Sequence, residues 1–415
     1  MTQELSIEGN TLPLQGIRVL ELGSFIAAPF AARLFGDFGA EVIKIEKPQG
    51  GDELRDWRKT RGTTSMLFRT IGRNKKSVVL DLRSETGREA VKRIAAQCDV
   101  VIENFRPGTL EKWGLGPDVL QELNPALVMV RISGYGQTGP YKNRAGFGSS
   151  AESFAGLRYI TGEPDRPAGR AAASMGDTVA GLYGVIGALM LMLQKARGAQ
   201  SAAQTRRSQV VDVALYEGVF SLLESLVPDY DAYGMIRQRT GGALPGVVPT
   251  GSYLCQDELE VVIGGNSNSV FVRLMRAIGR DDLAEDETLL TTEARGAREE
   301  ELNGAISAWT GSMPLTEVLD KLDDAGVPAG PVYDAPSIAV DKHYLARDMI
   351  QTHEVVIENE PELIRFPGVV PKIPGHEGRV NWVGPELGQH TREVLQELAG
   401  MDAEEIAELG LQEVR

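Results

Sequence analysis

Histidine is scarce in this sequence of 415 residues, and all four histidines lie near its end, at His343, His353, His376 and His390. The first 342 residues therefore offer no histidine for general-base chemistry, a serine-type triad or a histidine-ligated metal. No two of the four have the i, i+4 spacing of a helical metal site. We expect packing or surface roles for them, no metal site, and chemistry done by carboxylates, cations or backbone groups.

Cysteine is also rare, with only Cys98 and Cys255 in the chain. Two thiols are too few for a disulfide framework or a four-thiolate metal site. They suit a reducing compartment, and we expect a cytoplasmic protein in which both are packing residues.

Long apolar runs are missing as well. The longest, residues 179–193, is shorter than the ~18–20 residues that span a bilayer, and it predicts a buried core helix. Residues 1–10 are polar and lack the charged-then-apolar pattern of a signal peptide. We expect no membrane association.

Positive charge is in deficit, because 43 Lys and Arg face 58 Asp and Glu, for a net charge of −15. That balance disfavours nucleic acid as a partner. An acidic protein can still bind an anionic small molecule in a local basic pocket. Lys47, Arg83 and Arg106 each follow a predicted strand, and ligands collect at the carboxyl ends of parallel strands.

Strand and helix patterns alternate through the first half of the chain. Apolar strands at 16–24 and 41–47 enclose a helical pattern at 25–40, which is a βαβ unit. Thr86 and Glu89 suggest a capping box for a later helix. This alternation predicts an α/β fold with a large, Rossmann-like, mostly parallel sheet. Further strands are expected at 77–83, 99–105 and 126–133.

The chain divides into a large and a small domain in this interpretation. We place the N-terminal part of the large domain in residues 1–225, a smaller α+β domain in 226–330, and a linker with a C-terminal return to the large domain in 331–415. Glycine rises from about residue 230, and residues 325–334 are rich in Pro and Gly. The polar segment 197–209 is expected to be a surface loop.

Gly134, Gly136 and Gly139 have the G-x-G-x-x-G spacing of a dinucleotide-binding turn. In that motif the third glycine opens a helix, and an acidic residue ends a strand about 20 positions on. Neither feature follows Gly139. We therefore interpret the glycines as a tight turn after a strand, and we disfavour a nicotinamide or flavin enzyme.

Asp177 precedes the long apolar pattern and has small neighbours, Gly176 and Ala180. An N-cap aspartate is the ordinary explanation for such a position. A carboxylate can also attack a thioester, which yields a mixed anhydride that passes the acyl group on. That chemistry needs neither histidine nor metal.

Several stretches together resemble the family III CoA-transferases, the group of formyl-CoA transferase and carnitine CoA-transferase. They span residues 16 to about 350 and include GIRVLELGSFIAAPFAARLFGDFGAEVIKIEKPQGGDELRDW, DVVIENFRPGTLEKWGL, LNPALVMVRISGYGQTGPY and GDTVAGLYGVIGALM. GLRYITGEPDRP is most similar to the branch that uses succinyl-CoA with C4–C5 dicarboxylates.

The resemblance implies a large Rossmann-like domain and a small domain in each chain of an interlaced homodimer. It implies CoA and acyl-CoA as substrates and no permanently bound cofactor. Asp177 matches the catalytic aspartate, and Gly241 and Gly242 fall in a glycine-rich loop over the active site. The positions that match CoA-binding residues are Ile26, Ala27, Lys47, Leu80, Arg83, Asn104, Phe105, Arg106, Lys112 and Arg144.

The chain departs from the family pattern after its glycine turn. Phe147 and Gly148 stand where many members carry a Tyr-Asp or Tyr-Glu pair, so an acidic group is missing. Ala145 holds the place of a frequent lysine, with Arg144 adjacent. These departures concern the acceptor pocket rather than the fold.

The implied reaction transfers CoA from an acyl-CoA, by similarity succinyl-CoA, to a free dicarboxylic acid such as malate, itaconate, citramalate or glutarate. Asp177 attacks the thioester to form an anhydride, and the CoA thiolate returns to give an aspartyl-CoA thioester. The acceptor carboxylate then takes CoA through a second anhydride. Arg158, Arg166 and Arg170 are candidates for holding the second carboxylate, because they lie near Asp177 in sequence.

Two alternatives stay open at this point. A non-catalytic CoA-binding subunit would keep the fold without the reaction. The α-methylacyl-CoA racemases resemble the N-terminal part of the chain, but that branch uses a histidine in the first half as one of its two bases, and this sequence has none there.

Overall fold

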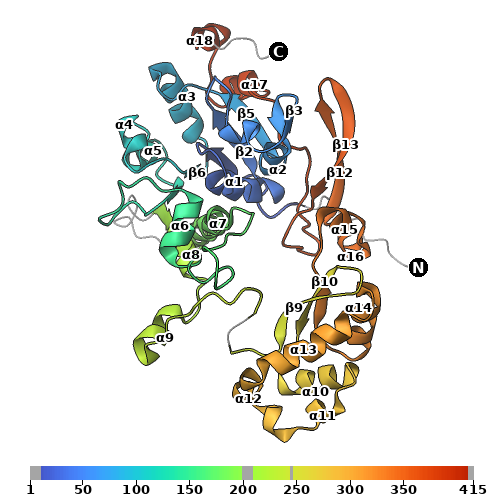
Figure 1. Cartoon of the computed structure of the whole chain (residues 1–415). Coiled ribbons are helices and arrows are strands. Elements are labelled where there is room, and N and C mark those ends of the chain that lie inside the picture. Colours follow the sequence, from blue (N-terminus) through green and yellow to red (C-terminus); the bar gives the residue numbers. More distant parts are fainter. Residues whose placement is uncertain (1–10, 199–208, 244–245, 410–415) are drawn as a thin grey trace, which may run out of the picture. The chain divides into compact units, whose positions relative to one another are not determined.

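The computed structural model describes residues 11–198, 209–243 and 246–409, which form two compact units (Figure 1). Among these residues, the first unit contains 11–157, 171–224 and those from 342 on, and the second contains 158–170 and 225–341. The domain boundaries expected at 225/226 and 330/331 stay predictions. Most of the expected surface loop, residues 199–208, lies outside the described residues.

A six-stranded sheet forms the centre of the first unit, and every neighbouring pair of its strands is parallel. This confirms the predicted α/β class with a parallel sheet. In spatial order the strands are β5 (Lys75–Val79), β2 (Glu41–Glu46), β1 (Arg18–Glu21), β6 (Val100–Glu103), β7 (Val128–Ser133) and β8 (Val210–Ala214).

Side chains alternate between the two faces of this sheet, as the period of two in a strand requires. Val19 belongs to a buried cluster with side chains of helices α1 and α7, whereas its neighbour Leu20 belongs to a cluster with α3, α5 and α17. Helices therefore cover both faces, which explains the near-continuous apolar strands. These helices are α1 (Ala27–Asp37), α3 (Glu85–Ala95), α5 (Pro117–Leu123), α7 (Met175–Ala196) and α17 (Thr391–Glu397).

The C-terminal part of the chain returns to the edge strand β5, where α17 lies beside it (Figure 1). The backbone N–H of His390 donates to Ser77 O at 3.0 Å, and Ser77 N–H donates to Nδ1 of His390 at 3.2 Å. Val79 N–H donates to the Thr391 hydroxyl at 3.0 Å. These bonds pair part of an edge that would otherwise expose free N–H and C=O groups.

Helix α7 corrects the expectation of a buried core helix. Ala180, Gly181, Gly184 and Ala188 face the core, but large apolar side chains elsewhere on the helix are exposed. It is the one described helix long and apolar enough to cross a membrane by length and composition, with 33% of its most apolar window buried. The exposed side chains include Leu182, Ile186, Met190 and Leu193.

Two local expectations are settled by backbone geometry. The capping box at Thr86 and Glu89 is wrong, because α3 starts earlier, with Ser84 as N-cap accepting from Gly87 N–H at 3.0 Å. No helix starts at Gly139, and the next one, α6 (Gly148–Ala155), starts nine residues later. A dinucleotide-binding turn needs a helix at its third glycine, so the structure agrees with the rejection of that motif.

The second unit has its own core beneath an antiparallel sheet of order β11-β10-β9. Its elements are α9 (Leu226–Tyr233), β9 (Thr250–Leu254), β10 (Glu260–Gly264), α10 (Asn268–Ala277), α11 (Asp281–Ala284), η4 (Glu287–Leu290), α12 (Thr292–Ala297), α13 (Glu299–Thr310), α14 (Leu315–Asp324), β11 (Ala329–Pro331) and α15 (Ala335–Val340). The first unit also contains η1 (Glu53–Asp56), β3 (Thr60–Arg61), β4 (Thr64–Ser65), α2 (Met66–Ile71), α4 (Thr109–Lys112), α8 (Leu215–Phe220), α16 (Lys342–Ala346), the hairpin β12 (Ile350–Ile357) and β13 (Glu360–Pro367), and α18 (Ala403–Glu408).

Candidate active site

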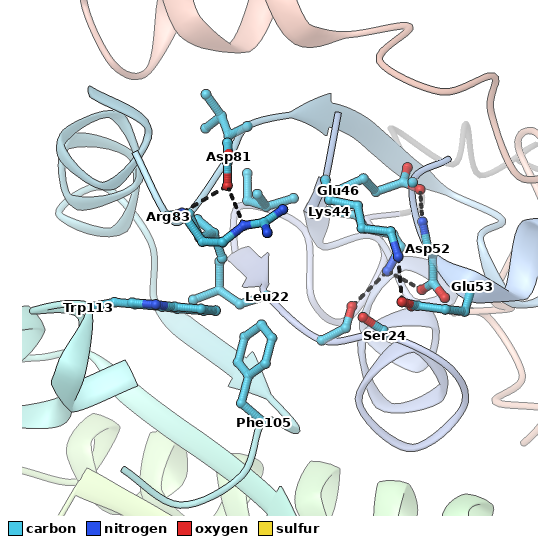
Figure 2. Close-up of a pocket in the computed structure, with 16 residues that line it drawn as sticks. Leu22, Ser24, Lys44, Glu46, Asp52, Glu53, Asp81, Arg83, Phe105 and Trp113 are labelled. Atoms are coloured by element: carbon cyan, nitrogen blue, oxygen red, sulfur yellow. Dashed lines mark hydrogen bonds and ion pairs between the residues drawn. The ribbon is translucent and has the colours of Figure 1, made fainter. Parts of the chain in front are cut away.

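The sheet order reverses between β1 and β6, since β2 and β5 extend it on one side and β7 and β8 on the other. In open parallel sheets, ligands bind beyond the carboxyl ends of the strands at such a point. A cavity of about 240 Å³ lies there, lined by residues at and beyond the ends of β1, β2, β5 and β6 (Figure 2). Four of the residues predicted to bind CoA line it: Lys47, Leu80, Arg83 and Phe105.

Buried charges form one side of this cavity (Figure 2). Lys44 Nζ lies 2.6 Å from Glu21 Oε1 and 2.7 Å from Asp52 Oδ2, and Lys75 Nζ lies 2.7 Å from Glu21 Oε2. Burial by itself lowers the pKa of Lys44, but Asp52 and Glu21 outweigh it and raise that pKa above its usual value. Burial lowers the pKa of Lys75 to about 8, although Glu21 opposes the shift. Lys44 is thus held in place by carboxylates and forms a fixed part of the cavity lining.

The cations at the rim are more accessible. Lys47 Nζ contacts Glu53 Oε1 at 2.5 Å, with 45% of the Lys47 side chain exposed. Arg83 is 74% exposed, and its Nε contacts Asp81 at 3.3 Å. Exposed ion pairs of this kind are weak, so both cations can exchange their partners for an anionic ligand.

An aromatic pair, Phe105 and Trp113, lies on the same side of the cavity as Arg83 (Figure 2). Phe105 and Trp113 pack edge to face with ring centroids 5.2 Å apart. Phe105 follows β6, where its N–H donates to the buried carboxylate of Glu103 at 2.7 Å, and Trp113 follows α4. The cavity therefore combines flat apolar surface with positive charge.

The turn after β1 is held in a strained shape. Asn104 Oδ1 accepts from Ser24 N–H at 2.9 Å, and Asn104 Nδ2 donates to Ser24 O at 2.8 Å. Phe25 has a left-handed φ of 62° and donates its N–H to Asp52 Oδ1 at 3.0 Å. A bulky residue in this region costs about 1–3 kcal/mol and persists where its surroundings impose it, typically at functional sites. Asn104 thus positions the turn with its amide.

Ile26 and Ala27 follow this turn and are buried at the start of α1. Helix α1 packs closely on α7 there, because a Cβ added to Gly181 would stand 2.9 Å from Ala27 O. The turn beside the cavity is thereby tied to the helix that carries Asp177.

Asp177 is partly buried in the first turn of α7 and lies against the start of α6. A Cβ built on Gly148 would stand only 2.1 Å from Asp177 Oδ2. Gly148 is the first residue of α6, so the amino ends of two helices converge on this carboxylate. Helix amino ends stabilise negative charge. Glu152 of α6 adds to the contact by accepting from Gly176 N–H at 3.3 Å.

Three aromatic rings connect the two parts of the site. Phe25 packs on Trp57 at 5.3 Å between centroids and on Phe147 at 6.0 Å, and Trp57 and Phe147 lie 6.2 Å apart. Phe147 directly precedes Gly148, and Phe25 directly follows Ser24 of the cavity. We call Phe25, Trp57 and Phe147 the aromatic triad.

Other predicted site residues lie outside the cavity. Arg106 and Lys112 adjoin Phe105 and Trp113 in sequence without lining it. Arg144 stacks on Tyr141, with its guanidinium carbon 3.6 Å from the ring centroid.

The glycine loop and the three candidate arginines belong to the second unit, whereas Asp177 belongs to the first. Gly241 has a left-handed φ of 63° and donates to Gly162 O at 3.0 Å. Nearness in sequence to Asp177 therefore does not place Arg158, Arg166 or Arg170 in the unit that carries it.

Sequence reasoning missed Asp52, Trp57 and Trp113. Trp113 had an available signal, since it directly follows Lys112, a residue that the resemblance singled out. Asp52 and Trp57 had none, because their roles depend on contacts with Lys44, Phe25 and Phe147 that only the fold creates. Among the described residues, no group of three or more His, Cys, Asp or Glu could hold a metal ion.

The chain belongs to CoA-transferase family III, whose family model matches residues 14–391. It is 45% identical over 401 residues to the succinyl-CoA–D-citramalate CoA-transferase of Chloroflexus aurantiacus, covering 96% of each chain. It is 40% identical over 401 residues to the alpha subunit of the succinyl-CoA–L-malate CoA-transferase of Chloroflexus aurantiacus, covering 96% of this chain and 91% of that subunit.

A solved CAIB/BAIF family protein from Brucella suis matches with a TM-score of 0.80 and 30% identity, over 94% of this chain and 100% of that one. The predicted family and enzyme class, a CoA-transferase, are confirmed.

Proposed function

We propose that this enzyme transfers CoA from succinyl-CoA to a free C4–C5 dicarboxylic acid, with Asp177 as the nucleophile. The names of two similar proteins pair succinyl-CoA with citramalate and with malate, which are acids of this class. The observation that carries the proposal is the contact of the Asp177 carboxylate with Gly148, beside an aromatic triad that leads to the cavity at the sheet reversal.

The cavity suits the nucleotide end of CoA. Phe105 and Trp113 offer apolar faces on which an adenine ring would pack. Arg83 and Lys47 would exchange their exposed carboxylate partners for CoA phosphates, and charge-assisted bonds to phosphate are among the stronger hydrogen bonds. In this proposal Leu80 completes the wall, Asn104 holds the turn before Ile26 and Ala27, and Arg106, Lys112 and Arg144 supply further positive charge.

The reaction then proceeds in two balanced halves. Asp177 attacks the thioester carbonyl and expels CoA thiolate, which gives an aspartyl anhydride. The thiolate attacks the aspartyl carbonyl, so that succinate leaves and an aspartyl-CoA thioester forms. The acceptor carboxylate repeats these steps in reverse and departs as the new acyl-CoA. Backbone N–H groups of the loop at Gly241 and Gly242 would stabilise the oxyanions.

A second copy of the chain would cover the exposed face of α7. Leu182, Ile186, Met190 and Leu193 are exposed and form an apolar stripe at helical spacing, and contiguous apolar surface of this kind is typical of a protein–protein interface. We propose a homodimer in the cytoplasm, with no membrane or nucleic acid partner and with CoA as substrate rather than bound cofactor.

The direct test combines purified protein with succinyl-CoA and, separately, with malate, itaconate, citramalate, mesaconate, glutarate, formate, oxalate and carnitine. Mass spectrometry would follow each new acyl-CoA and any adduct on the Asp177 peptide. We expect transfer to a C4–C5 dicarboxylate and complete loss in Asp177→Ala. CoA binding without transfer or adduct would favour the alternative of a non-catalytic CoA-binding subunit.

A further inference from the structure

Arg58 follows directly on Trp57 of the aromatic triad and reaches the segment that enters α7. Its Nη2 donates to Ala172 O at 3.3 Å, and Ala172 lies five residues before Asp177. Arg58 has a left-handed φ of 66°, a conformation that side-chain-bearing residues adopt at a cost. The backbone is thus bent where this guanidinium turns toward the entry to the helix of Asp177.

Asp177 and Arg58 belong to one closed series of contacts. Asp177 lies against Gly148, whose neighbour Phe147 packs on Trp57 at 6.2 Å. Trp57 continues into Arg58, which returns to the chain before Asp177 through Ala172. Every member belongs to the first unit, so these contacts form within one body.

The charge of Arg58 has no carboxylate partner among the described residues, unlike that of its neighbours. Arg55 is paired with Glu46 at 2.7 Å, and Arg61 is paired with Glu362 at 2.6 Å. Arg58 is exposed, and the bond to Ala172 uses Nη2, which leaves Nε and Nη1 without a hydrogen bond to described residues. Arg58 also borders a cavity of about 530 Å³, whose lining does not include Asp177.

We propose that Arg58 binds the distal carboxylate of the dicarboxylic group carried on Asp177. This inference rests on the proposed function. A guanidinium presents its N–H groups in a planar fork that matches a carboxylate, and an arginine in an acidic protein without a counter-ion is suited to accept one. Donor and acceptor would use the same residue in turn, because both are dicarboxylic. Arg58 belongs to the unit that carries Asp177, whereas the other candidates, Arg158, Arg166 and Arg170, belong to the second unit.

The test compares acids that differ only at the distal end. Glutarate and pentanoate both have five carbons, and pentanoate ends in a methyl group. Wild type should prefer glutarate, and Arg58→Ala should lower kcat/KM for glutarate at least about tenfold, as the loss of a hydrogen bond to a charged group predicts. Transfer to pentanoate should change less than about twofold, since that acid makes no bond to Arg58. Succinyl-CoA against butyryl-CoA gives the same comparison for the donor.

Lys59→Ala is the matched control, because Lys59 is the adjacent exposed cation. It should leave the glutarate-to-pentanoate ratio unchanged, and Arg58→Lys should restore part of it. Equal losses with both acids in Arg58→Ala would assign Arg58 only a structural bond to Ala172 and overturn the inference, as would an unchanged ratio. If wild type transfers CoA to no acid at all, the proposed function itself fails.

Discussion

The carboxylate of Asp177 occupies the space that a side chain at Gly148 would take, with Oδ2 2.1 Å from the position of an added Cβ. Many family members carry an acidic residue at the position of Gly148. In this chain the carboxylate of Asp177 lies in that space instead. Gly148→Ala should displace the carboxylate. A displacement of about 1 Å costs about a hundredfold in rate, so we expect kcat to fall by about that factor. KM for succinyl-CoA should change little, because the cavity at the sheet reversal is separate from this contact. Steady-state kinetics would measure both parameters.

Gly304→Ala is the control for that substitution, because an added Cβ at Gly304 meets open space in α13. Gly148→Asp should be worse than Gly148→Ala, since it adds a like charge beside Asp177. Full kcat in Gly148→Ala would mean that Asp177 reacts from a different position, and the proposed geometry would be wrong.

Arg83 provides a second test, at the other end of the site. Arg83→Ala should raise KM for succinyl-CoA about tenfold by removing a cation from the phosphates, and kcat should stay within about twofold. Lys92→Ala on α3, whose partner is Glu89, should change neither value. The penalty should vanish with a donor lacking the 3′-phosphate if Arg83 binds that group. An unchanged KM with the normal donor would remove Arg83 from the site.

The strands of the large sheet could be predicted from the sequence. A strand that is buried on both faces of a parallel sheet appears as a near-continuous apolar run, and β1, β2 and β6 have such runs. These runs predicted the large sheet and a binding site at the carboxyl ends of its strands. The site residue Asp177 came from resemblance, with a local explanation, an N-cap, competing against it.

Long-range pairings were not readable. Lys44 lies only three residues before Lys47, yet it is buried, and the register of β1 and β2 sets it opposite Glu21. Trp57 meets Phe147 although the two lie ninety positions apart in sequence, and nothing in either local sequence encodes that contact. Arg158 lies near Asp177 in sequence, but it folds with the second unit. Nearness in sequence therefore does not decide which unit a residue belongs to where the chain leaves and re-enters a unit.

His390 should make the C-terminal return sensitive to acid. Burial is the main cause that lowers the pKa of His390, Glu393 opposes the shift and Lys76 adds to it. Nδ1 accepts from Ser77 N–H, which a protonated ring cannot do. Since the folded-state pKa is below the unfolded value of about 6.5, the unfolded chain binds the proton first, and stability is lost as pH falls below that value.

Urea unfolding of wild type and His390→Asn between pH 7.5 and 5 checks this prediction. The stability advantage of wild type over the variant should shrink as the pH falls below about 6.5. His353, whose pKa is also lowered chiefly by burial, is present in both proteins and cancels in the difference. If the stability of both proteins changed with pH in parallel, His390 would not control the pairing of the C-terminal part of the chain with β5.

The exposed stripe on α7 gives the test of assembly. If a second copy covers it, wild type should have twice the mass of one chain by light scattering, and Ile186→Glu with Met190→Glu should yield monomers, because two charges would be buried without partners. Leu123→Glu is the control: Leu123 is 49% exposed on α5, which covers the opposite face of the sheet, and its substitution should leave the dimer intact. A wild-type monomer, or a double variant that stays dimeric, would mean that the stripe is not the interface.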